Sequence, residues 1–132
     1  MTLTLTLDPR SPAPAVQQIA DGLRVLLVQG ELSPGDMLPP VRVLARELVV
    51  HFNTVAEAYR RLEAEGWLEV RRKHGTVVRS RPSPQQADGD LDNFAAELLR
   101  LVARYRGLGI TESTLAHSLR EQAAKLEGYN NV

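Results

Sequence analysis

Residues 38–62 constrain the fold of this chain more than any other stretch, because two short amphipathic patterns meet there across a very brief break. Each pattern places its apolar side chains on one helical face and its charged side chains outside that face. Gly66 follows the second pattern, at a position where a residue in the left-handed conformation commonly ends a helix. The apolar positions are Val41, Leu44, Ala45 and Leu48 in the first pattern, and Val55, Ala58, Tyr59 and Leu62 in the second.

The break between the two patterns covers only residues 49–52. So short a connection forces two helices to cross steeply and to pack through their apolar faces. Pro39 and Pro40 suit the start of the first helix, because no intrahelical N–H bond is lost there. The stretch therefore predicts a helix-turn-helix in which residues 51–54 project outward from the start of the second helix, where they would face a DNA groove.

Residues 67–78 follow the second helix and have the pattern of two short strands around a basic turn. The β-prone residues are Trp67, Leu68, Val70, Val77 and Val78. The tip is formed by Arg71, Arg72, Lys73 and His74, beside Gly75. A hairpin with a cationic tip directly after a recognition helix is a wing, which lays positive charge on the phosphates or into the minor groove.

Four motifs in residues 17–78 together resemble the N-terminal domain of the GntR family of transcriptional regulators. They are G-x-L-x-P-G-D-x-L-P at 30–39, V-R-x-L-A at 41–45, N-T-V-x-x-A-Y at 53–59 and L-E-x-E-G at 62–66. The third motif, with a short tail, is most similar to the YtrA-type branch, and this resemblance implies a dimeric repressor of a transporter operon. His51 and Phe52 stand where that branch usually has a polar residue and then proline or arginine, and Lys73 stands where the wing usually has a first glycine. These departures bear on the sequence of the operator and not on the mode of DNA binding.

The helix-turn-helix and the wing supply the predicted DNA-binding residues. Arg42 is expected at a phosphate or a base edge, and Asn53 is expected both to cap the second helix and to lie at the groove with Thr54. Phe52 has two readings, a plug for the core or a contact to a thymine methyl group. The predicted set is Arg42, His51, Phe52, Asn53, Thr54, Arg71, Arg72, Lys73, His74, Gly75 and Thr76.

Composition limits what the chain does. The 16 basic and 16 acidic residues give a formal net charge of zero, so the basic charge needed for DNA must be local. Cys is absent, which excludes disulfides and fits a reducing cytoplasm. No apolar run reaches membrane-spanning length, so a cytoplasmic protein without a membrane partner is expected. Nothing in the sequence identifies a small-molecule effector.

The N-terminal third is expected to support the helix-turn-helix. Residues 2–7 alternate strictly and predict a short strand with Leu3, Leu5 and Leu7 on one face, paired either with the wing or with a partner chain. Residues 14–29 predict an amphipathic support helix closed by Gly30. In the loop that follows, Leu32 and either Met37 or Leu38 are expected to plug the underside.

The C-terminal third predicts two more helices after a linker. Residues 79–90 hold hardly anything to bury, so the expected division is a DNA-binding domain at 1–78, a linker at 79–90 and a helical region at 91–132. Gly107 and Gly109 separate the helices, and Thr111 is the expected N-cap of the second. The apolar stripes dock either on a second chain, as a dimerisation hairpin, or in cis on the winged domain. The predicted dimer interface is Phe94, Leu98, Leu101, Val102, Tyr105, Leu115 and Leu119.

The predicted fold class is therefore mostly α with a small β wing (α+β): a winged helix-turn-helix followed by a helical hairpin. The predicted partners are double-stranded DNA with a palindromic operator and a second copy of the chain. An enzyme is not expected, because the chain has no Gly-rich phosphate loop, no nucleophile elbow and no Cys. The three histidines are scattered, so neither a metal nor a cofactor is predicted. The alternative function is a winged-helix adaptor that contacts only proteins.

Overall fold

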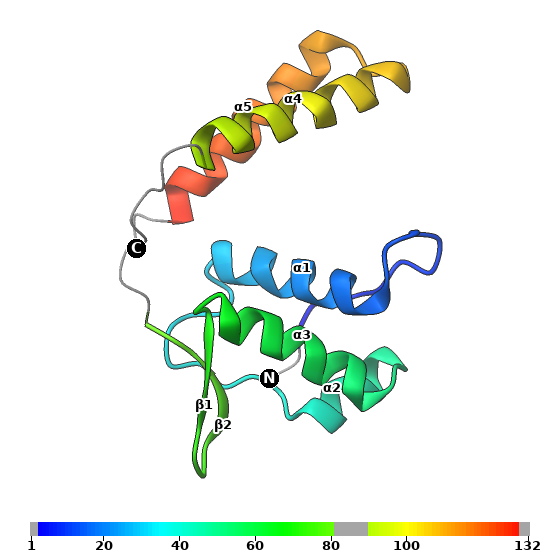
Figure 1. Cartoon of the computed structure of the whole chain (residues 1–132). Coiled ribbons are helices and arrows are strands. Elements are labelled where there is room, and N and C mark those ends of the chain that lie inside the picture. The colour runs from blue at the N-terminus through cyan, green and yellow to red at the C-terminus, as the bar shows by residue number, and fades with distance from the viewer. Residues whose placement is uncertain (1–2, 81–89, 130–132) are drawn as a thin grey trace. The chain divides into compact units, whose positions relative to one another are not determined.

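The computed structural model describes residues 3–80 and 90–129, and the chain divides into two compact units at residues 82 and 83. The first unit contains α1 (Ala15–Val28), α2 (Val41–Leu48), α3 (Phe52–Ala64), β1 (Leu68–Arg71) and β2 (Gly75–Val78). The second contains α4 (Asp90–Gly107) and α5 (Glu112–Tyr129) (Figure 1). The predicted α+β fold, a winged helix-turn-helix followed by a helical hairpin, is confirmed. Residues 81–89, most of the expected linker, lie outside the described residues.

The three helices of the first unit enclose one hydrophobic core. Helix α3 packs against both α1 and α2, because its apolar stripe is flanked by theirs. Leu32 and Leu38 are buried beneath the loop after α1, whereas the Met37 side chain is 57% exposed. The largest fully buried side chains are Ile19, Leu23, Leu44, Val55, Leu62 and Leu68.

Tyr59 belongs to this core, as the apolar pattern of α3 predicts. Its ring is buried, and its hydroxyl donates a 2.7 Å hydrogen bond to the Pro39 carbonyl oxygen. Burial, with a smaller contribution from the Glu47 carboxylate, raises the pKa of the Tyr59 hydroxyl well above its ordinary value. This hydrogen bond connects the segment before α2 to α3, and so it fixes the position of the chain at the start of the helix-turn-helix.

The turn between α2 and α3 is held by an unusual backbone conformation. Val49 has φ 57° and ψ 50°, the left-handed region that β-branched residues rarely adopt. This conformation lets the Val50 N–H bond back to the Ala45 carbonyl at 3.0 Å and ends α2 at once. The Val49 side chain is 87% exposed, so packing does not compensate the strain.

The wing is a two-stranded antiparallel hairpin, as predicted. Its register runs from Leu68 opposite Val78 to Arg71 opposite Gly75. Met37 adds an isolated bridge to Val77, which attaches the loop after α1 to the wing. At the tip, the His74 N–H bonds to the Arg71 carbonyl at 3.0 Å, and Lys73 has φ 76°. A positive φ at the third residue of this turn corresponds to type II geometry, which favours glycine there.

The strand expected at residues 2–7 does not form in residues 3–7, so of the two predicted acceptors the wing is wrong, and a partner chain stays a prediction. The segment is extended, and its leucines at 3, 5 and 7 are half-buried against the core cluster. Leu5 lies against Gly22 of α1, where any side chain would collide with it. The Asp8 N–H then bonds to the Gln18 side chain at 2.8 Å. The alternating leucines therefore pack on the core and on α1, and they do not belong to a strand that pairs with a neighbour.

The second unit consists of α4 and α5 joined by a short turn. Thr111 is the N-cap of α5, as predicted, because its hydroxyl accepts the Thr114 N–H at 3.2 Å. None of residues 90–128 is buried. None of the helices in the described parts of the chain is long and apolar enough to cross a membrane.

Candidate nucleic-acid interface

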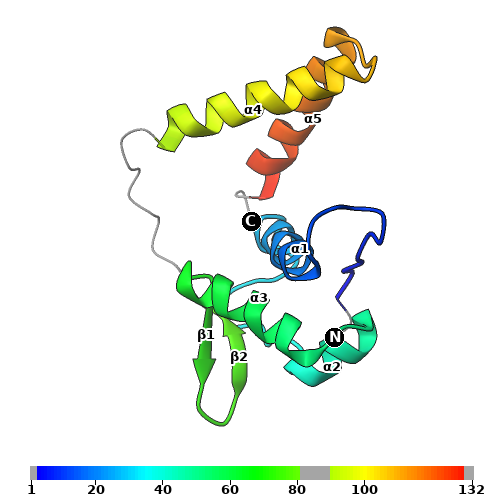
Figure 2. The ribbon, with the colours of Figure 1, turned by 45° about the vertical axis from the view of Figure 1, so that its right-hand side comes forward.

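The candidate interface lies on the first unit and comprises α2, the start of α3 and the wing. Figures 1 and 2 both place α2 and the wing on the side of α3 that faces away from α1. Because α1 covers the opposite side, the turn and the wing are left as the projecting features of this unit. This is the arrangement that the helix-turn-helix and wing patterns predict.

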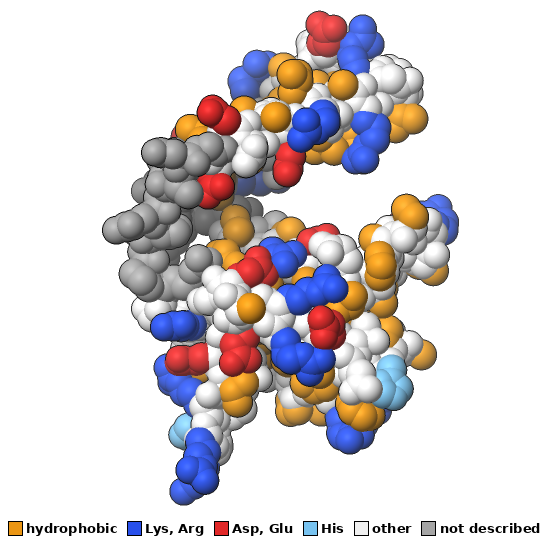
Figure 3. All heavy atoms as spheres, in the orientation of Figure 1, with side chains coloured by type: hydrophobic (Ala, Val, Ile, Leu, Met, Phe, Trp, Pro, Cys, Tyr) orange, Lys and Arg blue, Asp and Glu red, His pale blue; other side chains and the backbone are white. Residues whose placement is uncertain are grey.

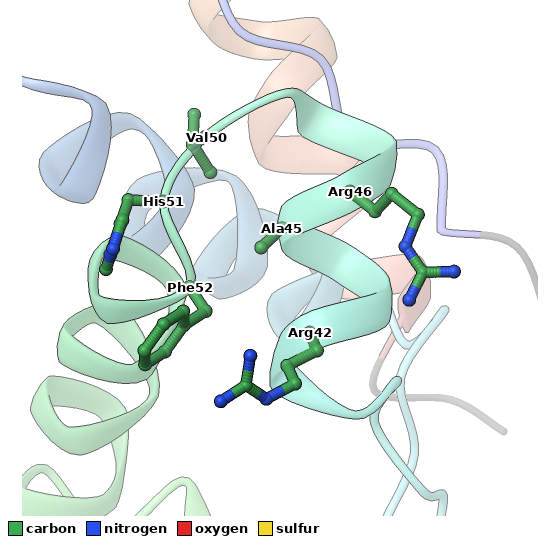
Figure 4. A pocket seen from close by; sticks show the side chains of 6 residues that line it. All are labelled: Arg42, Ala45, Arg46, Val50, His51 and Phe52. Carbon is green, nitrogen blue, oxygen red and sulfur yellow. The ribbon is translucent and has the colours of Figure 1, made fainter.

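The turn carries a stack of three planar side chains around a shallow hollow of about 320 Å³. The Phe52 ring lies between the His51 ring and the Arg42 guanidinium (Figure 4). The two ring centroids are 4.5 Å apart with an interplanar angle of 27°, and the Arg42 guanidinium carbon is 4.3 Å from the Phe52 centroid. The hollow is lined by Arg42, Ala45, Arg46, Val50, His51 and Phe52.

The N-cap of α3 is His51, and the prediction that Asn53 caps this helix is wrong. The helix begins at Phe52, so Asn53 already lies in its first turn. The Nδ1 atom of His51 accepts the Asn53 N–H at 3.0 Å, which replaces the usual side-chain oxygen of a cap. An accepting Nδ1 requires the proton of neutral His51 to be on Nε2. Asn53 is exposed, and its side chain is not used as a cap.

The wing tip provides a second group of cations, which Figure 3 shows at the end of the hairpin. Arg72, Lys73 and His74 are exposed in the turn between β1 and β2. Arg71 differs from them, because it lies in β1 and its guanidinium pairs with the Glu69 carboxylate at 2.7 Å. Gly75 and Thr76 lie in β2, where the Thr76 carbonyl accepts the Leu38 N–H at 2.9 Å.

Ion pairing explains how a chain of zero net charge presents a positive surface. On the α1 side of the unit, Arg24 pairs with Glu65 at 2.7 Å. On α3, Arg60 pairs with Glu57 at 2.8 Å, and this hydrogen bond lowers the pKa of the Glu57 carboxyl. By contrast, four cations at the turn and tip form no ion pair within the described residues: Arg42, Arg46, Arg72 and Lys73. Within the described residues of the first unit, the unpaired lysine and arginine side chains other than Arg79 therefore lie on the projecting features.

Two features of the surface were not predicted. Arg46 lines the same hollow as Arg42, since residues four apart share a helical face, and this spacing is visible in the sequence. On α5, His117 lies 3.2 Å from the Glu121 carboxylate, also four residues apart. This second pair is exposed on the helical hairpin and belongs to no cluster that could hold a metal among the described residues.

A helix-turn-helix that begins its second helix beside unpaired arginines, flanked by a wing with a cationic tip, defines a winged-helix DNA-binding protein. Residues 15–78 match the family model described as bacterial regulatory proteins, gntR family. The chain is 32% identical over 124 residues to the transcriptional repressor YtrA of Bacillus subtilis, covering 94% of this chain and 95% of that protein. The chain belongs to the GntR family and is a transcriptional regulator, not an enzyme, as its sequence predicts.

Solved structures agree with this assignment. YtrA from Sulfolobus acidocaldarius, a GntR-family transcription factor, is 36% identical, with a TM-score of 0.56 over 80% of this chain and 98% of that chain. A Listeria monocytogenes EGD-e protein described as a transcriptional antiterminator has a TM-score of 0.73 over 92% of this chain and 90% of that chain. Its sequence identity is 22%, so that likeness concerns the fold alone.

Proposed function

We propose that this regulator is a dimeric repressor that binds a palindromic operator through its α2–α3 turn and its wing. The observation that carries the proposal is that Arg42, Arg46, Arg72 and Lys73 on these two features form no ion pair within the described residues, while Arg24 on α1 and Arg60 on α3 are paired with carboxylates. Similarity to the repressor YtrA of Bacillus subtilis supports repression. The resemblance to the YtrA-type branch supports a transporter operon as the regulated unit.

In this proposal, the first turn of α3 enters the major groove. Asn53 is exposed there, and its side-chain amide, which caps nothing, suits a phosphate or a base edge. The neutral His51 ring offers an Nε2–H donor at the same end of the helix. Arg42 supplies a guanidinium with all of its donors unpaired among the described residues.

The wing in this proposal neutralises phosphates. Arg72, Lys73 and His74 project from the tip, whereas Arg71 is held by Glu69 and contributes less. Gly75 and Thr76 are the first two residues of β2, directly after the tip. They belong to the proposed interface through their backbone atoms. Contacts of this kind give affinity that depends strongly on salt and little on base sequence.

The helical hairpin in this proposal joins two chains. Helices of this size without a buried residue cannot stabilise one another alone, so their apolar faces need a partner surface. A two-fold dimer also gives two recognition helices, which a selective operator requires. Leu98, Val102 and Leu115 are half-buried within the hairpin. The other four predicted interface residues are exposed: Phe94, Leu101, Tyr105 and Leu119.

The experiment that tests this function is selection of duplexes from a random-sequence pool by the purified full chain, followed by gel retardation and light scattering. We expect an enriched inverted repeat with half-sites about one helical turn apart, and a dimeric mass. Arg42→Ala is expected to weaken binding of the selected duplex. If no sequence is enriched and no duplex is retarded at low salt, the adaptor reading replaces this one.

A further inference from the structure

We propose that Phe52 is a positioning residue that holds the Arg42 guanidinium at the α2–α3 turn, so that Arg42 reads a guanine edge in the operator. This inference rests on the proposed function, because it assumes that the turn meets the major groove. It assigns Phe52 a role different from both sequence-based readings, in which Phe52 either plugs the core or contacts a thymine methyl group.

The first step is the anchoring of the Phe52 ring. Phe52 is the first residue of α3, and its half-buried ring packs against the hydrophobic core cluster. The His51 ring stacks on it at 4.5 Å and is itself fixed by the bond from the Asn53 N–H to Nδ1. The ring is therefore held both by the core and by the cap of the helix.

The second step is what this ring does to Arg42. The Arg42 side chain is exposed, and its guanidinium has no hydrogen bond or ion pair within residues 3–80 and 90–129. Its contact at 4.3 Å is with the face of the Phe52 ring. A cation over an aromatic face is attracted to it, and stacking leaves every N–H donor in the guanidinium plane free.

The third step excludes other uses of the ring. His51 and Arg42 both contact the Phe52 ring (Figure 4), and the ring is half-buried, so little of it is left to stack on a base. The guanidinium is one of the two exposed members of the stack, and in this proposal it is the one that meets the DNA base edge. A fixed, planar guanidinium matches the O6 and N7 acceptors of guanine, which arginine binds with two hydrogen bonds.

The test is a double-mutant cycle between Phe52 and Arg42. The two probes are the duplex that the parent protein selects from a random pool and a shuffled duplex of the same composition. Phe52→Leu keeps an apolar side chain in the core but removes the aromatic face, and Phe52→Tyr keeps the face. Thermal melts and light scattering on every variant establish that fold and mass are unchanged.

We expect Phe52→Leu and Arg42→Ala each to weaken binding of the selected duplex by about tenfold, and binding of the shuffled duplex by less than about twofold. The double variant should bind the selected duplex no more weakly than Arg42→Ala, because Phe52 acts only through Arg42. Phe52→Tyr should bind as the parent does.

Four outcomes would overturn the inference, and each of them contradicts a different part of it. If Phe52→Leu binds normally while Arg42→Ala is weak, positioning is wrong and the proposed interface survives. If the two losses multiply in the double variant, Phe52 has its own DNA contact, for example to a thymine methyl group. Equal losses on both duplexes would assign Arg42 to a phosphate. If Arg42→Ala itself binds normally, the proposed interface at this turn fails.

Discussion

At the scale of single residues, two positions depart from ordinary backbone chemistry: Val49 and Lys73 are the described non-glycine residues with positive φ. A side chain with a β-carbon is disfavoured in this region, and a β-branched one most of all. Neither residue is buried, so the strain comes from the chain path demanded by the turn and by the wing tip. Substitutions at these two positions can therefore test effects on stability separately from effects on DNA binding.

Val49→Gly should stabilise the protein. Relief of the left-handed strain stabilises the folded state by about 1–2 kcal/mol. Glycine also has greater freedom in the unfolded chain, which offsets part of this gain, so we expect a net stabilisation of about 0.5–1 kcal/mol. Urea denaturation measures the free energy of unfolding. Val43→Gly is the matched control, since Val43 is 38% exposed, has helical backbone geometry as the third residue of α2, and its replacement should destabilise by about 1 kcal/mol. A loss of stability in Val49→Gly would contradict the strain.

His51→Ala should destabilise the protein by about 1 kcal/mol, because it removes the N-cap of α3. Asn53→Ala should melt within a few degrees of the parent, because the Asn53 backbone, not its side chain, takes part in the cap. Thermal melts of the two variants compare the losses directly. A larger loss in Asn53→Ala than in His51→Ala would return the cap to Asn53.

Tyr59 should make the protein sensitive to high pH. Its pKa is raised in the folded state above the unfolded value of about 10, so the unfolded chain loses this proton first. The stability is complete below pH 10 and falls as pH rises above it, by about 1.4 kcal/mol per pH unit. Tyr59→Phe should flatten this dependence and should cost about 1 kcal/mol at neutral pH through the lost bond to Pro39. Urea denaturation of both proteins between pH 8 and about pH 11 compares the slopes, and equal slopes would contradict the assignment.

At the scale of elements, the wing combines a strained turn with the charge that the proposed function needs. Lys73 occupies the third position of the tip turn, where glycine is favoured, and Gly75 follows it with φ 80°. The lysine therefore puts a cation at the tip at the expense of turn stability. Replacing Lys73 with glycine would remove the charge and relieve the strain, so weaker binding of that variant could not be attributed to a loss of stability.

Lys73→Gly should weaken binding to all duplexes by similar factors and lower the salt slope by about one, while the protein melts at or above the parent temperature. Titrations at several salt concentrations measure the slope, and Lys73→Arg, which keeps the charge, is the control. An unchanged slope with an altered preferred duplex would mean that the tip reads bases.

At the scale of the whole molecule, the two units contrast in how they are stabilised. The winged unit buries a continuous cluster that reaches from Ile19 to Val78. In the helical hairpin none of residues 90–128 is buried, although apolar side chains lie along both helices. The hairpin is therefore the part of the chain whose stability should depend on protein concentration, if it forms the proposed dimer.

A chain truncated after Arg81 should remain folded and become monomeric, with a steep loss of affinity for the selected duplex. The folded part keeps its core, but two half-site contacts no longer add through one assembly. Light scattering at micromolar concentration and gel retardation measure mass and affinity. If the full chain is already monomeric and the truncated chain binds equally well, the dimer proposal is wrong and the hairpin packs in cis.

Periodic and turn-forming residues made much of the fold predictable. The α2 and α3 faces, the wing strands and the Thr111 cap follow from apolar spacing, glycines and capping chemistry within a few neighbouring residues. The N-terminal segment was misassigned because alternation at residues 3–7 is equally satisfied by packing on α1 at Gly22. The pattern records which face is buried and carries no information about what buries it.

The sequence alone determined the family, the winged helix-turn-helix and the candidate residues at the turn and tip, because these depend on local spacing and on motifs read in order. Tertiary structure decided which of those residues are free to act. It paired Arg71 with Glu69, made His51 the cap in place of Asn53, and laid Arg42 on the Phe52 ring. Arg42 and Phe52 lie on different helices, and they meet only because Val49 takes a left-handed conformation that brings α3 back against α2.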